Sequence, residues 1–174
     1  VSYLAENSKQ LVIIAHLWRP KSPSPSTSFA QVVKELEKRL WKSVHFVSDL
    51  EQTTIDSIKI WEHQIIMIEN IRYFEWEDSK EAAEQQILID KLTQLADVFV
   101  NDAFADYRKS VSSYYIAKHL PSYVGTLFAQ EVSKLAYLAH SPKPFVVLMW
   151  GSKLSEKLDA LLWLLPLADH VLIG

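Results

Sequence analysis

Short apolar runs alternate with longer segments of helical periodicity along this chain, and that alternation constrains its fold most strongly. The runs are rich in β-branched residues and lie at 11–15, 44–47, 64–68, 98–100, 145–149 and 170–173. They are nearly continuous in apolar character, as strands buried on both faces are. Strands that alternate with helices form parallel sheets. The sequence therefore predicts an α/β fold: a three-layer α/β/α, Rossmann-like domain with a mainly parallel, doubly wound sheet of about six strands.

The segments between the apolar runs have the signals of helices. The first can be capped by Ser26, Thr27 or Ser28, residue types that accept hydrogen bonds from a helix N-terminus. Its apolar residues recur at helical spacing: Phe29, Val32, Val33, Leu36 and Leu40. Further helices are predicted at 51–60, 79–96, 111–120, 128–140 and 155–165. The helix at 111–120 is expected to stop at Pro121.

The composition excludes several classes of protein and partner. The chain of 174 residues has no cysteine, which excludes disulfides and thiolate metal sites. Its formal net charge of −3 gives no electrostatic reason to expect nucleic acid or an anionic membrane as a partner. No apolar run reaches the roughly 18 residues of a membrane span, and residues 1–6 do not resemble a signal peptide. We therefore expect a cytoplasmic monomer.

Glycine is unusually rare, with 3 residues in the whole chain, whereas tryptophan occurs 6 times. Average glycine usage is about 7%. Parallel α/β proteins place glycines in the tight turns where strands meet ligands. The scarcity of glycine predicts that this chain has lost part of the turn geometry with which such proteins bind ligands.

Basic side chains follow several predicted strands, at the edge of the sheet where such folds bind ligands. Arg19 follows the first strand, Arg72 the third, and Arg108 and Lys109 the fourth. Guanidinium and ammonium groups on one rim suit a small phosphorylated or carboxylated anion. His16, directly after the first strand, is either a proton-transfer group or a structural histidine, and the residues favour the structural interpretation.

Plainer interpretations of these residues stay open. A single loop arginine is usually solvated surface, so only the grouping of several argues for a site. The other histidines are scattered without the spacing of metal ligands, and we expect no metal site. The tryptophans are better explained as core residues than as a base-stacking platform, because no basic excess accompanies them.

Taken in order, these loops resemble the motifs of phosphoglycerate kinases. Residues 16–21 are similar to H-L-G-R-P-K, residues 69–74 to E-N-L-R-F/Y, and residues 95–104 to L-A-D-V-Y-V-N-D-A-F. Residues 119–121 match the stretch before that family's interdomain helix, and 145–157 are similar to F-x-x-x-L-G-G-A-K-x-S-x-K. The similarity covers nearly the whole chain.

The resemblance implies a glycolytic enzyme that passes a phosphoryl group between ATP and 3-phosphoglycerate. In such enzymes one domain holds the acid, the other holds Mg-nucleotide, and catalysis is mostly positioning and charge stabilisation. His16, Arg19 and Arg72 fall on positions of the basic patch that binds the acid. Lys153 and Lys157 fall on lysines that approach the nucleotide phosphates and the transferring group.

The resemblance also predicts a domain division. Residues 1–141 correspond to the acid-binding domain and interdomain helix, without that domain's first strand and its catalytic arginine. Residues 142–174 correspond to the first βαβ unit of the nucleotide domain, and we expect 145–173 to pack into the sheet of the preceding segment. We expect no Mg-ATP or Mg-ADP site in this chain, because most of the nucleotide domain is not represented.

Several departures from the family pattern bear on function. Where the family has G-T-A-H-R-A-H, this chain has Ala-Asp-Tyr-Arg-Lys-Ser-Val at 105–111. Both histidines are replaced, Lys109 stands for the arginine, and Asp106 adds a negative charge beside the expected anion site. Trp18, Tyr115 and Trp150 replace loop glycines of the family.

Three hypotheses about function follow from this pattern. The first is an engineered or reassembled domain of the phosphoglycerate kinase fold, not catalytic by itself, with at most weak binding of 3-phosphoglycerate or another small anion. The second is a fragment of an active phosphoglycerate kinase. The third is a degenerate structural subunit of an assembly.

Overall fold

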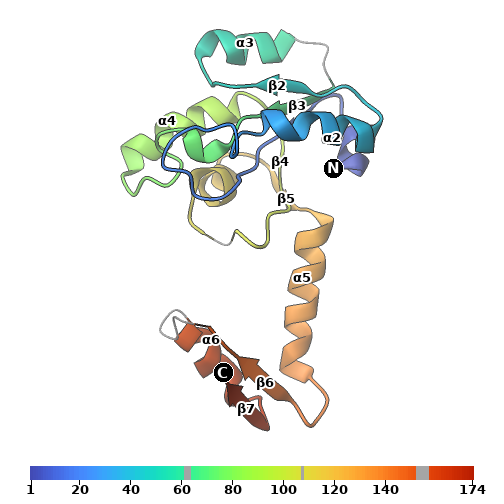
Figure 1. Cartoon of the computed structure of the whole chain (residues 1–174), viewed down its shortest axis with the longest axis vertical. Helices are drawn as coiled ribbons and strands as arrows, with labels where there is room; N and C mark the ends of the chain where they lie inside the picture. The colour runs from blue at the N-terminus through green and yellow to red at the C-terminus, as the bar shows by residue number, and fades with distance from the viewer. Residues whose placement is uncertain (61–63, 107, 152–156) are drawn as a thin grey trace. The chain divides into compact units, whose positions relative to one another are not determined.

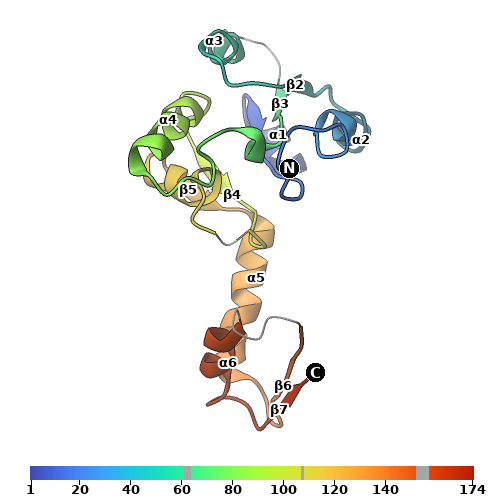
Figure 2. The ribbon, with the colours of Figure 1, turned by 60° about the vertical axis from the view of Figure 1, so that its left-hand side comes forward.

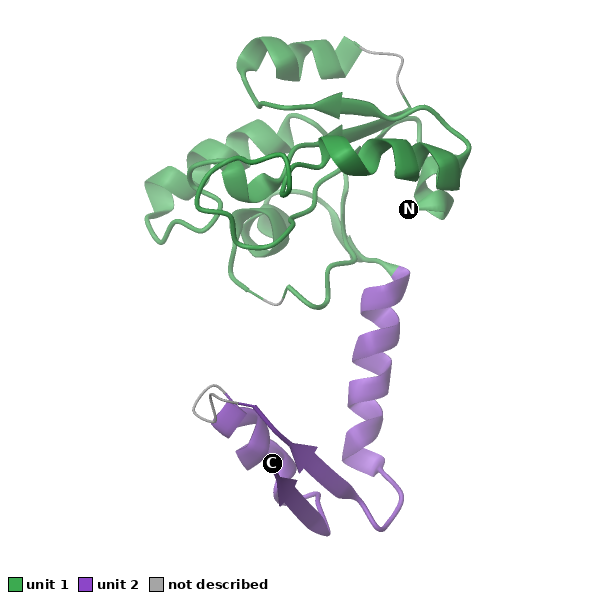
Figure 3. Cartoon of the chain, viewed as in Figure 1, with its two compact units in different colours: residues 1–125 green, residues 126–174 purple. Residues whose placement is uncertain are grey.

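The computed structural model describes residues 1–60, 64–106, 108–151 and 157–174. The chain divides into two compact units, residues 1–125 and 126–174 (Figure 3). The sequence placed this division after residue 141, whereas the structure places it before α5 (Thr126–Tyr137). The segment that the family resemblance assigned to an interdomain helix therefore groups with the second unit.

A parallel sheet of three strands is the centre of the first unit. Its order is β1 (Leu11–Ile13), β3 (Ile65–Ile68), β2 (His45–Val47), with β3 in the middle. Figure 1 labels β2 and β3, which are paired in parallel. Leu11 is opposite Ile65 and Val47 is opposite Ile68. All four residues of β3 are buried, as expected for a central strand covered on both faces.

Alternate side chains of β3 enter two different cores, because successive residues of a strand point to opposite faces. Ile65 and Met67 join the core that α2 (Ala30–Leu40) covers. Ile66 and Ile68 join the larger core, which includes residues of α3 (Gln52–Ile60) and α4 (Ala82–Thr93). This part of the chain therefore has the predicted three layers, with helices on both faces of a parallel sheet.

Shorter elements complete the first unit. They are α1 (Ser2–Asn7), the 3-10 turns η1 (Ile71–Tyr73) and η3 (Ile116–Lys118), and the π-helical turn η2 (Val111–Tyr115). The α-helix predicted at 111–120 is thus a π turn followed by a 3-10 turn. A second parallel sheet pairs β4 (Phe99–Asn101) with β5 (Ser122–Val124), a strand that the sequence did not predict.

The second unit contains α5, η4 (Leu138–His140), β6 (Val146–Met149), α6 (Leu158–Leu164) and β7 (His170–Ile173). β6 and β7 lie side by side as a parallel pair (Figure 2), with Val146 opposite His170. In the structure these two strands form a sheet of their own. The expected addition of 145–173 to the sheet of the preceding segment is therefore not found.

The parallel α/β class is confirmed, whereas the number and grouping of strands differ from the prediction. The described residues contain seven strands in three sheets, of three, two and two strands, where about six in one sheet were expected. Apolar runs indicate which segments are extended. They do not indicate which extended segments pair, because pairing depends on contacts between residues distant in sequence.

Candidate functional site

The carboxylate of Asp106 is the centre of a cluster of basic side chains. Its Oδ1 lies 3.2 Å from Nη2 of Arg72 and 3.1 Å from Nε of Arg108, and its Oδ2 lies 3.3 Å from Nδ1 of His16. The Arg72 side chain is 9% exposed and that of Asp106 is 13% exposed. Three of the predicted anion-binding residues therefore meet on one internal carboxylate.

The cluster assembles because its residues follow different strands. His16 comes after β1, Arg72 lies in η1 directly after β3, and Asp106 and Arg108 come after β4. Loops at the carboxyl ends of parallel strands are the usual ligand sites of such folds. Arg72 is further fixed by a hydrogen bond from Nη1 to the backbone carbonyl of Trp18.

The remaining two predicted basic residues lie differently. Arg19 is exposed and close enough to His16 to contribute to the lowering of its pKa. Lys109 places Nζ 5.8 Å from the centre of the Tyr114 ring, a cation–π contact. The structure therefore groups His16, Arg72 and Arg108, with Arg19 nearby, and directs Lys109 toward Tyr114.

Burial lowers the pKa of His16 below its usual value, and the charges of Arg72 and Arg19 lower it further. The Asp106 carboxylate acts in the opposite direction and raises that pKa. The net lowering favours the neutral imidazole at neutral pH, with Nδ1 facing Oδ2 of Asp106. The cluster of Arg72, Arg108 and Asp106 then carries a net charge of one positive unit.

Asn70 ties together the backbone segments that carry the basic residues. It is fully buried. Its Nδ2 donates to the carbonyls of Leu17 and Thr27, both at 2.9 Å, and its Oδ1 accepts the N–H of Arg72 at 3.3 Å. One side chain thus holds the segment after β1 and the start of η1 in register.

The segment after β4 is anchored by two other side chains. Asn101 donates from Nδ2 to the carbonyl of Ser113 at 2.9 Å and accepts the N–H of Ala103 at 3.0 Å. Glu77 accepts the N–H and the hydroxyl of Ser112, at 3.1 and 2.5 Å, at the start of η2. Glu77 is 4% exposed, and this burial raises its pKa to about 7 despite the hydrogen bonds.

Sequence reasoning noted Asp106 as a negative charge beside an anion site but missed Asn70 and Glu77 as supports. The E-N motif at 69–70 contained a signal for Asn70, because an Asn directly after a buried strand often hydrogen bonds to neighbouring backbone. Nothing in the local pattern marks Glu77, whose partner Ser112 is distant in sequence.

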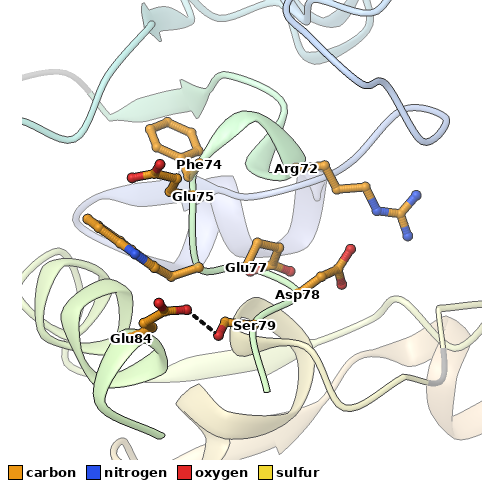
Figure 4. A pocket seen from close by; sticks show the side chains of 8 residues that line it. Arg72, Phe74, Glu75, Glu77, Asp78, Ser79 and Glu84 are labelled. Carbon is orange, nitrogen blue, oxygen red and sulfur yellow. Dashed lines mark hydrogen bonds between the residues drawn. The ribbon is translucent and has the colours of Figure 1, made fainter. Parts of the chain in front are cut away.

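A pocket of about 380 Å³ lies next to the cluster (Figure 4). Arg72 is on one side, and the figure shows its guanidinium extending away from Phe74 and from the hydrogen-bonded pair Ser79 and Glu84. Most of the charged residues that line the pocket are acidic: Glu75, Glu77, Asp78 and Glu84. This lining disfavours anions, so the pocket is not a continuation of the basic cluster.

The predicted nucleotide-phosphate lysines are in the second unit. Lys153 lies outside the described residues. Lys157 donates from Nζ to the carbonyl of Trp150 at 2.6 Å, so its ammonium is directed at the turn before it. Gly151 has a φ of 127°, and a Cβ there would meet Lys157 Nζ at 2.0 Å.

Within the described ranges, no group of three or more His, Asp or Glu side chains is arranged to hold a metal ion. None of the helices that the structure describes is both long enough and apolar enough to cross a membrane.

A model of the family described as "Phosphoglycerate kinase" matches residues 1–174. The chain belongs to the phosphoglycerate kinase family. The resemblance seen in the ordered motifs is thereby confirmed. Among curated relatives, the phosphoglycerate kinase of Salinispora tropica is 38% identical over 181 residues, covering 100% of this chain and 45% of the relative. That of Streptomyces coelicolor is 37% identical over 179 residues, covering 100% of this chain and 44% of the relative.

Solved phosphoglycerate kinase structures agree with this membership. The enzyme from Pyrococcus horikoshii matches with a TM-score of 0.84 at 27% identity, over 99% of this chain and 44% of its own. The enzyme from Coxiella burnetii matches with a TM-score of 0.77 at 28% identity, over 99% of this chain and 43% of its own. The chain thus spans less than half the length of the phosphoglycerate kinases it matches.

Proposed function

We propose that this chain carries the acid-binding half of a phosphoglycerate kinase, binds 3-phosphoglycerate or another small anion weakly, and does not catalyse phosphoryl transfer by itself. The observation that carries the proposal is the meeting of His16, Arg72 and Arg108 on one carboxylate. Donors that already hold an internal carboxylate have the spacing and direction that an external acidic group requires.

Weak affinity follows from the same contacts. An external anion gains only the difference between its own contacts and those that Arg72 and Arg108 already make with Asp106. The Arg108 side chain is 35% exposed, and ion pairs in contact with water contribute little, typically about 0 to 1 kcal/mol. We expect a dissociation constant on the order of millimolar, equivalent to about −4 kcal/mol.

The proposed lack of catalysis rests on the second unit. The exposed Lys157 ammonium is held by the carbonyl of Trp150. Trp150 stands where the family has a glycine, and its bulky, exposed side chain limits how closely a phosphate can approach. Trp18, Trp41 and Trp76 all have positive φ, between 53° and 63°, a conformation that glycine adopts most easily. These features support a derived domain, engineered or reassembled, that keeps the fold without the ligand geometry.

A titration of the purified 174-residue chain with 3-phosphoglycerate tests the binding proposal. Calorimetry or amide chemical shifts at low salt should show saturable binding that disappears in Arg19→Ala and in Arg72→Ala. Arg39→Ala is the matched control, because Arg39 is an exposed arginine that pairs with Glu35 on α2. A well-folded chain without saturable binding, or binding that survives Arg72→Ala, would overturn the proposal.

A second candidate, part of an active phosphoglycerate kinase, is favoured by identity of 37–38% that extends over the full chain. In that case groups beyond these residues complete the site. A coupled assay of phosphoryl transfer between ATP and 3-phosphoglycerate, run on this chain mixed with the carboxy-terminal half of a related phosphoglycerate kinase, separates the candidates. Turnover that is abolished by Arg72→Ala would favour the enzyme part, and no turnover above the buffer blank would favour the noncatalytic domain.

A further inference from the structure

We propose that Asp106 is an internal competing ligand of the basic cluster, an affinity-determining residue that must leave the arginines before phosphate or another small oxyanion can bind. This inference rests on the proposed anion-binding function. It goes further in assigning the low affinity to direct occupation of the site by one side chain. The competing ligands are defined by chemistry: small anions whose oxygens can accept from two guanidinium groups.

The geometry shows that Asp106 uses both carboxylate oxygens. Oδ1 is shared between Arg72 and Arg108, and Oδ2 faces His16. The guanidinium nitrogens of Arg72 are engaged on two sides, because Nη1 donates to the Trp18 carbonyl while Nη2 donates to Asp106. An oxyanion that contacts the same Arg72 and Arg108 nitrogens would have to occupy the position of Oδ1.

The backbone segment that carries Asp106 makes this competition effective, because it holds the carboxylate close to the arginines. Asp106 lies in a segment whose flanks are anchored, by Asn101 at the end of β4 and by Glu77 at the start of η2. A group held on a short tether has an effective concentration on the order of millimolar at its partner. An external anion of weak intrinsic affinity then has to exceed that concentration before it displaces the internal carboxylate.

Asp106 could instead act only through its charge, by repelling anions from a distance. The chain offers a matched test of that alternative, because Asp78 also acts electrostatically on the cluster and raises the pKa of His16. Asp78 is exposed and lines the acidic pocket next to Arg72. Removing the charge of Asp78 changes only the local electrostatic field. Removing that of Asp106 changes the field and also frees the arginine nitrogens that its carboxylate occupies.

The experiment is a titration with inorganic phosphate at fixed low ionic strength, read by amide chemical shifts, on the wild-type chain and three variants. Asp106→Asn removes the charge and keeps the shape. Asp106→Thr introduces the residue type of the family motif at that position. We expect both to bind phosphate about tenfold tighter or more, because an internal competitor at millimolar effective concentration has been removed. Asp78→Asn should stay within about threefold of the wild type, as expected of an exposed charge in water.

The possible results distinguish a failure of the internal-ligand proposal from a failure of the proposed anion-binding function. Equal phosphate affinity in the wild type and in both Asp106 variants would overturn the internal ligand and leave the anion site standing. An equal gain in Asp78→Asn would also overturn it, because the field alone would then explain the effect. No phosphate binding by any of the folded chains would overturn the anion-binding function and this inference together. The spectra themselves report whether each variant is folded.

Discussion

Glu69 caps helix α2 from a different element: its Oε1 accepts the backbone N–H of Phe29 at 2.8 Å. Phe29 is the N-cap residue of α2 and makes no side-chain cap of its own. The other oxygen of Glu69 accepts the hydroxyl of Ser28 at 2.5 Å, and Oε1 also accepts the N–H of Asn70 at 2.7 Å. The end of β3 and the start of α2 are thus joined by one buried carboxylate.

Replacing that carboxylate tests its contribution to stability. Glu69→Gln keeps the shape but removes the charge and turns one acceptor into a donor, which then faces the Ser28 hydroxyl or a backbone N–H. Hydrogen bonds to charged groups contribute about 1.5–3 kcal/mol, so we expect the free energy of unfolding to fall by roughly 2 kcal/mol. Urea denaturation measures it. Glu35→Gln, on the exposed face of α2, should change it by less than about 0.5 kcal/mol, and an equal loss in both variants would refute the cap.

The cap of α2 includes a residue that the local sequence pattern did not identify. The periodic apolar residues located α2 correctly, and Ser26, Thr27 and Ser28 were the natural candidates for its cap. Ser28 does accept the backbone N–H of Ala30, the first residue of α2, at 3.1 Å. The N–H of Phe29 is bound by Glu69, a residue far along the chain. Local patterns identify elements because side-chain periodicity follows backbone geometry. They do not identify partners that only the tertiary fold brings together.

The candidate site was likewise predicted only in part. The sequence identified the basic residues at strand ends, because the position of each strand end is a local property. It did not predict that Asp106 would contact three of them at once, or that Lys109 would turn toward Tyr114. It also missed β5, a strand of three exposed residues with no buried face to give an alternating pattern.

Trp41 is predicted to be a destabilising residue at the end of α2. It occupies the C-cap position with φ 53° and ψ 34°, and its side chain is 92% exposed. The left-handed conformation costs a residue with a Cβ roughly 1–2 kcal/mol. Glycine avoids this cost, but the greater flexibility of glycine in the unfolded chain offsets part of the gain in stability. Trp41→Gly should therefore raise the free energy of unfolding by about 0.5–1 kcal/mol.

Trp41→Ala is the control for that prediction, because alanine removes the indole but keeps the Cβ. Thermal and urea denaturation of the three chains should place the glycine variant above both others. If alanine stabilises as much as glycine, the exposed indole rather than the backbone conformation is the cause.

Glu77 should make stability fall as pH rises toward neutrality. Its pKa is raised from 4.5 to about 7 by burial, so the folded chain holds this proton more tightly than the unfolded chain does. Between about pH 4.5 and 7 the folded state binds more protons at this site, and the free energy of unfolding decreases with pH. At 1.36 kcal/mol per unit of pKa, the full effect is about 3 kcal/mol as an upper value.

Glu77→Gln mimics the protonated side chain and should remove this slope. The variant is expected to match the wild type near pH 5 and to be more stable than it near pH 8, as measured by urea denaturation across that range. Glu75→Gln makes the same chemical change on an exposed side chain nearby and should keep the wild-type slope. A Glu77→Gln chain with an unchanged slope would show that another group is responsible.

Asn70 should matter for anion binding as well as for stability, because it joins the two segments that position the basic residues. Asn70→Ala leaves the carbonyls of Leu17 and Thr27 without this donor, and unpaired buried groups cost about 1–3 kcal/mol each. The segment that carries His16 and Arg19 then loses its fixed distance from Arg72, and phosphate affinity should fall by about tenfold or more, since a small misplacement of a charged contact removes most of its benefit.

Gln85→Ala is the matched control: Gln85 is another buried amide, which donates to the carbonyl of Ser79 at 2.7 Å from helix α4. Its loss should lower the free energy of unfolding and leave phosphate binding unchanged, when both variants are titrated under conditions in which they are fully folded. Equal phosphate affinity in the Asn70→Ala and Gln85→Ala chains would mean that the position of the basic cluster does not depend on Asn70.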